Sequence, residues 1–179
     1  MKELLEVDKS FNEGMFITKV NNIYVSLKTC IMMRNLDRIR HFLSKEVEDK
    51  YDEIINRLKE NKEINMFDEL NVKESKISNI EITEDKIIIT VKLTSRYMDY
   101  IIDSDTKKYI SGINDHRIEK ENTLVFEKII NAKNYGLIKK CPTCGASIDL
   151  NKDGKCPYCK NIFDAENYDY ILTSIKEGV

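Results

Sequence analysis

The stretch KIIITVKLT at residues 86–94 has the clearest structural pattern in the chain. Its residues fall into two alternating rows, and one row is wholly aliphatic: Ile87, Ile89, Val91 and Leu93. β-Branched residues at a period of two are typical of a strand that buries one face. Residues 76–82 alternate in the same way, and Thr83-Glu84-Asp85 between the two runs is a turn sequence. The two runs therefore predict an antiparallel hairpin.

The alternation continues after this hairpin. Residues 97–103 extend the strand, and a bulge is expected near Ser95 because the run is long for one straight strand. Residues 108–121 are polar and predict a hairpin excursion with only a weak strand near its start. Residues 123–130 alternate again, and residues 169–175 predict a last strand.

The residues before the hairpin have a helical period. Apolar side chains in steps of three and four predict a helix over residues 11–34: Phe16, Val20, Ile23, Leu27 and Ile31. A short second helix is expected over residues 35–43. A third follows to about residue 62, with Ser44 as its N-cap. Three helices followed by antiparallel strands predict an α+β fold, in which the helices cover one face of a curved sheet.

Two Cys-Pro-x-Cys pairs lie near the C-terminus, and their cysteines are Cys141, Cys144, Cys156 and Cys159. Four thiolates from two such turns can surround one ion in the closed tetrahedron of a structural zinc site. Asp-Gly in residues 151–155 suits the tight turn that this short spacing requires. Iron in a rubredoxin-like site, two disulfides and four unrelated thiols are the alternatives. A closed site leaves no open position for water, so the Zn²⁺ is expected to hold the fold and to do no chemistry.

The order of these elements predicts how the chain divides. Residues 11–140 and 165–179 are expected to form the α+β domain, and residues 141–164 a zinc ribbon inserted before the last strand. A main domain of this size does not need the metal in order to fold.

The composition restricts the possible partners and the compartment. Charged residues make up 34% of the chain, but the net charge is only −2. Such a mixed surface does not favour binding driven by neutralisation of phosphates. The unpaired Cys30 beside four candidate ligands indicates a reducing compartment, and its place near the helical stripe predicts a core residue. With no signal-peptide pattern and no apolar run of spanning length, we expect a cytoplasmic protein.

Four sequence pieces, in this order, resemble the Tim44-like domain family: DRIRHFLS at 37–44, FDELNV at 67–72, MDYIID at 98–103 and YIL with Ile175 at 170–175. The resemblance covers roughly residues 11–179, and the cysteine pairs resemble the zinc-ribbon version of the domain found in bacteria. It implies a cone-shaped α+β fold related to nuclear transport factor two, and a docking or scaffold role. The mitochondrial member tethers a heat-shock chaperone to the inner-membrane translocase and touches anionic lipid.

The chain departs from that family in three respects. Tyr170 stands where the family usually has tryptophan, and only about a dozen residues precede the first predicted helix. No cluster of lysines and arginines marks a lipid-binding patch, so contact with a membrane surface is not supported by charge. No role in protein import is therefore carried over to this chain.

Three functions remain to be compared. The first is a non-enzymatic interaction module whose cone receives an unidentified protein partner or an apolar ligand, lined by Tyr97, Met98, Tyr100 and Phe126 unless these pack the core. The second is a cone-fold enzyme with His116 paired to Asp99 or Asp103. The third is a nucleic-acid-binding zinc ribbon, with Tyr158 and Phe163 stacking on bases beside lysines 139, 140, 152, 155 and 160. The sequence favours the first.

Overall fold

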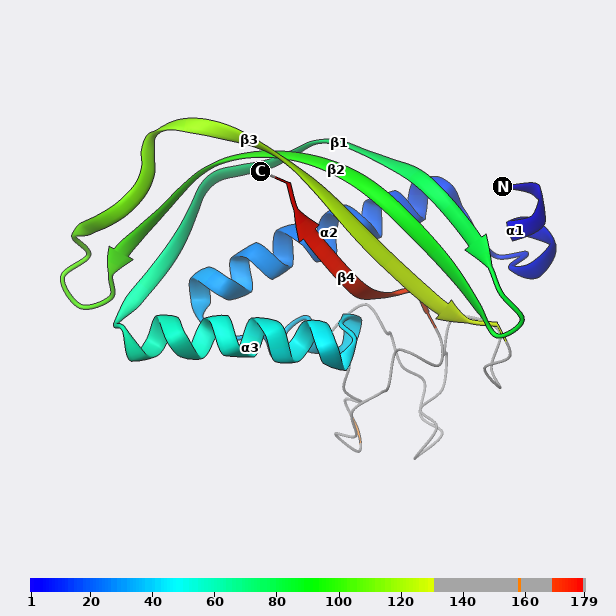
Figure 1. Cartoon of the computed structure of the whole chain (residues 1–179), viewed down its shortest axis with the longest axis horizontal. Helices are drawn as coiled ribbons and strands as arrows, with labels where there is room; N and C mark the ends of the chain where they lie inside the picture. Colours follow the sequence, from blue (N-terminus) through cyan, green and yellow to red (C-terminus); the bar gives the residue numbers. More distant parts are fainter. Residues whose placement is uncertain (131–157, 159–168, 179) are drawn as a thin grey trace.

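Three long antiparallel strands arch over two helices in the computed structural model, which describes residues 1–130, 158 and 169–178 (Figure 1). The helices are α1 (Lys2–Val7), α2 (Glu13–Met33) and α3 (Lys45–Glu60), and the short 3-10 helix η1 (Arg40–Phe42) precedes α3. The strands are β1 (Glu63–Ile82), β2 (Lys86–Asp103), β3 (Tyr109–Ile129) and β4 (Ile171–Glu177). They form one antiparallel sheet in the order β1-β2-β3-β4. The predicted α+β class, with helices on one face of a curved antiparallel sheet, is confirmed.

The ends of the helices follow from their capping residues. Asn12 caps α2, because its side chain accepts a hydrogen bond from the Met15 amide at 2.9 Å. Arg34 ends α2 in the left-handed conformation, with φ 55°. Ser44 caps α3 as the sequence predicts.

The second helix predicted over residues 35–43 is wrong. The Asn35 side chain accepts a hydrogen bond from the Asp37 amide at 2.8 Å, which favours a turn over a helix. Only η1 forms in this segment, although Leu36, Ile39 and Leu43 are still buried. The short helix α1, which was not predicted, precedes α2 and buries Leu4 completely.

The predicted hairpin is the centre of the sheet. β1 and β2 pair from Ile82 and Ile87 outward, and the Thr83 hydroxyl accepts a hydrogen bond from the Lys86 amide at 3.1 Å to close the turn. β1 is much longer than the predicted strand over residues 76–82. The polar excursion predicted over residues 108–121 is wrong for most of its length, because β3 is a strand that pairs with β2 on both sides of residues 114–117, which have no partner in β2.

The regular pairing of the three long strands is interrupted at the same level of the sheet. Glu69 in β1 has φ 55°, and the β1–β2 register shifts between Asp68 and Asn71. In β3 the register with β2 jumps between Ile113 and Ile118. The Arg117 Nε and a Glu69 carboxylate oxygen lie 3.5 Å apart, which links the two irregularities across β2. We call the part of the sheet beyond this level, residues 63–68 and 98–113, the arm; it is the left end of the arch in Figure 1.

The short strand β4 is held by lysines from several elements. Lys19 Nζ lies 2.6 Å from the Asp169 carboxylate and 2.8 Å from the Tyr170 carbonyl oxygen, and Lys50 donates to the Ile175 carbonyl at 3.3 Å. Lys28 pairs with Glu177. Ser44 at the start of α3 also donates its backbone N–H to the Leu172 carbonyl at 2.9 Å. β4 thus joins α2, α3 and β3.

Candidate functional site

A cluster of buried polar side chains lies between α2 and the sheet. The Tyr24 and Ser95 hydroxyls are 2.8 Å apart, and the Asn122 side-chain amide donates to both at 3.3 Å. All three residues are 0 or 1% exposed. Within the described residues, the Asn122 carbonyl oxygen and the Tyr97 hydroxyl have no hydrogen-bond partner of regular geometry, although Tyr24 lies close enough to influence the pKa of Tyr97.

A buried lysine occupies the same interior. The Lys28 side chain is 3% exposed, and its Nζ lies 2.6 Å from the Glu177 carboxylate. The same ammonium lies over three aromatic rings, 4.4 Å from the centre of Phe67, 5.2 Å from Tyr97 and 5.8 Å from Tyr24. Cation–π contacts and one charge-assisted hydrogen bond therefore replace the water that the ammonium loses. The chain's own lysine fills the aromatic interior.

Burial governs the acid–base behaviour of the phenols in this cluster. It raises the pKa of Tyr24 to about 12, and it also raises the pKa of Tyr97 and of Tyr51. These hydroxyls stay protonated at neutral pH, so they serve as hydrogen-bonding groups and not as bases.

The residues predicted to line the cone pocket are divided between two environments. Tyr97 and Phe126 are 0% exposed and belong to the hydrophobic core. Met98 and Tyr100 are half-buried on the arm. Met98 and Tyr100 alternate with Tyr97 along β2 and so face away from the helices. The four side chains therefore do not lie together on one wall. Whether the domain binds a ligand in a cone pocket stays a prediction.

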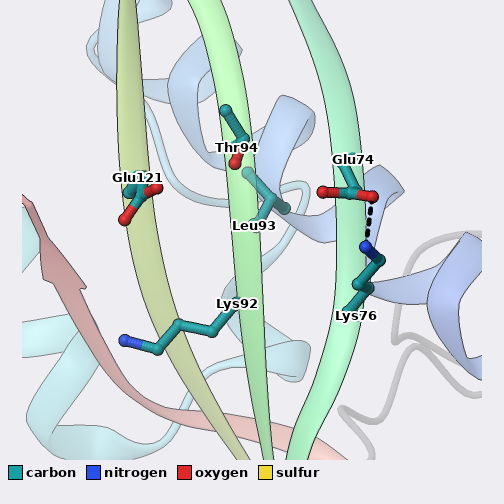
Figure 2. Close-up of a pocket in the computed structure, with 6 residues that line it drawn as sticks. All are labelled: Glu74, Lys76, Lys92, Leu93, Thr94 and Glu121. Carbon is teal, nitrogen blue, oxygen red and sulfur yellow. Dashed lines mark ion pairs between the residues drawn. The ribbon is translucent and has the colours of Figure 1, made fainter.

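A shallow depression lies on the face of the sheet that the helices leave uncovered (Figure 2). It has a volume of about 270 Å³ and is lined by Glu74, Lys76, Lys92, Leu93, Thr94 and Glu121. Figure 2 shows Glu74 and Lys76 turned toward one another, with a carboxylate oxygen and Nζ 2.6 Å apart. Lys92 extends toward β3, where it donates to the Thr123 hydroxyl at 2.8 Å. Because these charged groups are bound to their neighbours, they do not converge on a ligand.

The catalytic pair considered from the sequence is not assembled. His116 lies on an exposed part of β3, and its Nδ1 is 2.7 Å from the carboxylate of its neighbour Asp115. Asp99 accepts a hydrogen bond from the Asn65 amide at 2.9 Å, and Asp103 accepts from the Thr106 amide at 2.7 Å. Both aspartates are therefore engaged away from His116.

The predicted zinc site lies outside the described residues, and so do the boundaries of the predicted 141–164 insertion. Its four ligands are Cys141, Cys144, Cys156 and Cys159. The same holds for Phe163 and the lysines considered for nucleic-acid binding. Among the residues that are described, no group of three or more histidine, cysteine, aspartate or glutamate side chains is arranged to hold a metal. Cys30 is buried, and burial raises the pKa of its thiol, as expected of a core residue.

The comparison with protein families agrees with this architecture. The family model described as the Tim44-like domain matches residues 1–141, which include every element from α1 to β3. The chain belongs to the Tim44-like domain family. The Tim44-like match begins ten residues before the predicted boundary and ends at the first cysteine, so β4 lies beyond it.

Tim44-like domains are generally binding modules, and they interact with proteins or membranes. The crystal structure of the intermembrane space region of the chloroplast protein ARC6 is similar at 4% sequence identity and a TM-score of 0.43, over 89% of this chain and 94% of that chain. No curated protein sequence matches the chain. Across the described ranges of this Tim44-like domain, no helix is both long and apolar enough to cross a membrane.

The buried lysine was missed in the sequence, although a signal for it is present. Lys28 follows Tyr24 by four residues and comes directly after Leu27, so it lies on the stripe of α2 that faces the core. A lysine in that position needs a buried partner, and the sequence did not indicate that the partner is Glu177 at the other end of the chain.

Proposed function

We propose that this Tim44-like domain is a non-enzymatic docking module whose partner is another protein. The observation that carries the proposal is the buried ion pair in the aromatic interior. The Lys28 ammonium is engaged by its counter-ion Glu177 and by the rings of Phe67, Tyr97 and Tyr24, so these interior groups contact one another and do not await a substrate. A partner is then expected to bind the outer surface.

We further propose that the four cysteines bind structural zinc. The support for this is the donor set, since two Cys-x-x-Cys pairs supply the four thiolates of a closed tetrahedral site. The zinc would stabilise the segment that joins β3 to β4, and it would leave the docking surface to the α+β domain.

Affinity capture from the native host, followed by reconstitution from purified components, tests the docking function. We expect a saturable complex with a purified host protein, and His116→Ala is expected to bind with unchanged Kd. Native mass spectrometry of the protein purified from the host adds an independent measurement. A small molecule retained in stoichiometric amount and lost in Tyr97→Phe would indicate an interior ligand site and would overturn the proposal.

A further inference from the structure

Two polar atoms of the buried cluster around Tyr24 have no hydrogen-bond partner of regular geometry within the described residues. They are the side-chain carbonyl oxygen Oδ1 of Asn122 and the hydroxyl of Tyr97. Asn122 is 1% exposed and Tyr97 is 0% exposed, so bulk solvent does not reach either atom. Buried polar groups in folded proteins bond to another protein group or to an ordered water molecule, with few exceptions. These two atoms therefore require a partner.

The orientation of the Asn122 amide is fixed by its surroundings. Its nitrogen donates to the Lys120 carbonyl oxygen at 3.2 Å and to the Leu93 carbonyl oxygen at 3.4 Å. Backbone carbonyl oxygens only accept hydrogen bonds, so turning the amide over would place Oδ1 against two acceptors. Oδ1 therefore stays on the other side of the amide, where it needs a donor.

A count of the hydrogens in the cluster shows what is missing. Tyr24 and Ser95 share one hydrogen bond of 2.8 Å, which uses the hydrogen of only one of the two hydroxyls. The Asn122 nitrogen donates to both of these oxygens at 3.3 Å. The other hydroxyl hydrogen and that of Tyr97 then lack a well-placed acceptor among the described residues, while Oδ1 lacks a donor. A group that both accepts and donates would satisfy all of them.

We propose that this cluster binds one internal water molecule, which accepts a hydrogen bond from the Tyr97 hydroxyl and donates one to Asn122 Oδ1. Buried water molecules typically make about three hydrogen bonds to polar groups that the fold leaves unpaired. The spare hydrogen of the Tyr24–Ser95 pair supplies the third. Because Tyr24, Tyr97 and Asn122 lie on α2, β2 and β3, the water would join three elements of the domain. This inference goes beyond the docking function and does not depend on it.

The charges around the cluster favour water over an ion. The Lys28 ammonium lies 5.2 Å from the centre of the Tyr97 ring and 5.8 Å from that of Tyr24. A metal cation bound to these hydroxyls would therefore lie close to a buried positive charge, and the two would repel one another. An anion gains little, because Glu177 already pairs with Lys28 at 2.6 Å. A small neutral molecule that donates and accepts is the ligand that the cluster suits.

A high-resolution crystal structure of the full chain tests the proposal directly. We expect density for one water molecule at about 2.7–2.8 Å from both Tyr97 Oη and Asn122 Oδ1. Three results would overturn the proposal: both atoms paired with protein groups, both atoms without any partner, or density that belongs to an ion or a larger molecule.

Urea unfolding of Tyr97→Phe tests the same hydrogen bond in solution. If water pairs the hydroxyl, its removal should raise the equilibrium constant for unfolding by about five- to tenfold, because the water then has one bond fewer. A hydroxyl buried without a partner gives the opposite result, since phenylalanine removes an unsatisfied group and leaves the domain as stable as before or more so. That result would contradict the proposal.

Water-selective nuclear magnetic resonance distinguishes a bound water from a direct bond between Tyr97 and Tyr24. We expect a nuclear Overhauser cross-peak between water and the Asn122 side-chain amide hydrogens in the wild type, reduced in Tyr97→Phe. Tyr170→Phe is the matched control, because it removes another buried hydroxyl, whose partner is Asp8, and it should leave the cross-peak unchanged. A wild type without this cross-peak, or an equal reduction in Tyr170→Phe, would refute the water site.

Discussion

Glu177→Gln should destabilise the domain more than Lys28→Met, although each substitution removes the same ion pair. The two ends of the pair lie in different environments: the Lys28 side chain is 3% exposed and the Glu177 side chain is 41% exposed. Loss of the glutamate charge leaves an ammonium buried without its counter-ion, whereas loss of the lysine leaves a carboxylate that water can solvate.

These environments set the magnitudes. A buried charge deprived of its partner costs about 3–5 kcal/mol. Contacts with three aromatic rings and a glutamine oxygen offset part of this, so we expect Glu177→Gln to lower the free energy of unfolding by about 2–3 kcal/mol. Methionine replaces the lysine stem at similar volume, and Lys28→Met should cost about 1 kcal/mol or less.

Urea unfolding followed by far-ultraviolet circular dichroism measures both values. The double variant provides the control, because once Lys28 is methionine the second substitution should add less than about 0.5 kcal/mol. A Lys28→Met variant that is as unstable as Glu177→Gln, or more so, would refute the view that the buried ammonium depends on Glu177.

Three further predictions concern the N-terminus, the arm and the cysteines. Burial alone would raise the pKa of Asp8, but bonds from Lys128, Ser10 and Tyr170 outweigh it and lower that pKa below 3.8. The ionised carboxylate therefore stabilises the fold at neutral pH, and the stability advantage of wild type over Asp8→Asn at about pH 7 should shrink steadily as the pH of urea titrations falls below about 4. Gly112→Ala should lower the free energy of unfolding by about 1–3 kcal/mol, because Gly112 has φ 102° and a Cβ would lie 2.5 Å from the Asp99 carbonyl oxygen. Thermal melts measure this loss. Gly14→Ala is the control and should melt like the wild type, because its Cβ would meet nothing closer than 3.5 Å. Metal analysis of the wild type should find one zinc per chain, and Cys144→Ser should lose it while keeping the helical circular dichroism signal. If chelation of the metal abolished that helical signal, the main core would not be independent of the zinc site.

The fold class could be predicted because its central elements have regular periods. Residues 86–94 bury one row of aliphatic side chains and continue into a neighbouring strand through a short turn, and both features are local. The stripe of α2 and the Ser44 cap of α3 are local as well. The bounds of β2, α2 and α3 were predicted within a few residues, whereas β1 begins well before the predicted strand.

The remaining errors arose where backbone pairing outweighs the side-chain pattern. Residues 109–121 have few buried side chains, so they showed no alternation, yet pairing of residues 109–113 and 118–121 with β2 makes this range part of a strand. The partner of Lys28 could not be predicted, because Glu177 lies 149 residues away. Met98 and Tyr100 were singled out as pocket residues, but their position on the outer face depends on which row of β2 the helices cover.

The ribosome makes β4 late, since residues 130–170 are synthesised between β3 and β4. At roughly 5–20 residues per second this takes about 2–8 seconds. During that interval the nascent sheet presents the open edge of residues 122–127, and the Lys28 ammonium has not yet met its counter-ion. Because burial of an ammonium without its counter-ion is costly, close packing of this part of α2 against the sheet is expected to wait for Glu177.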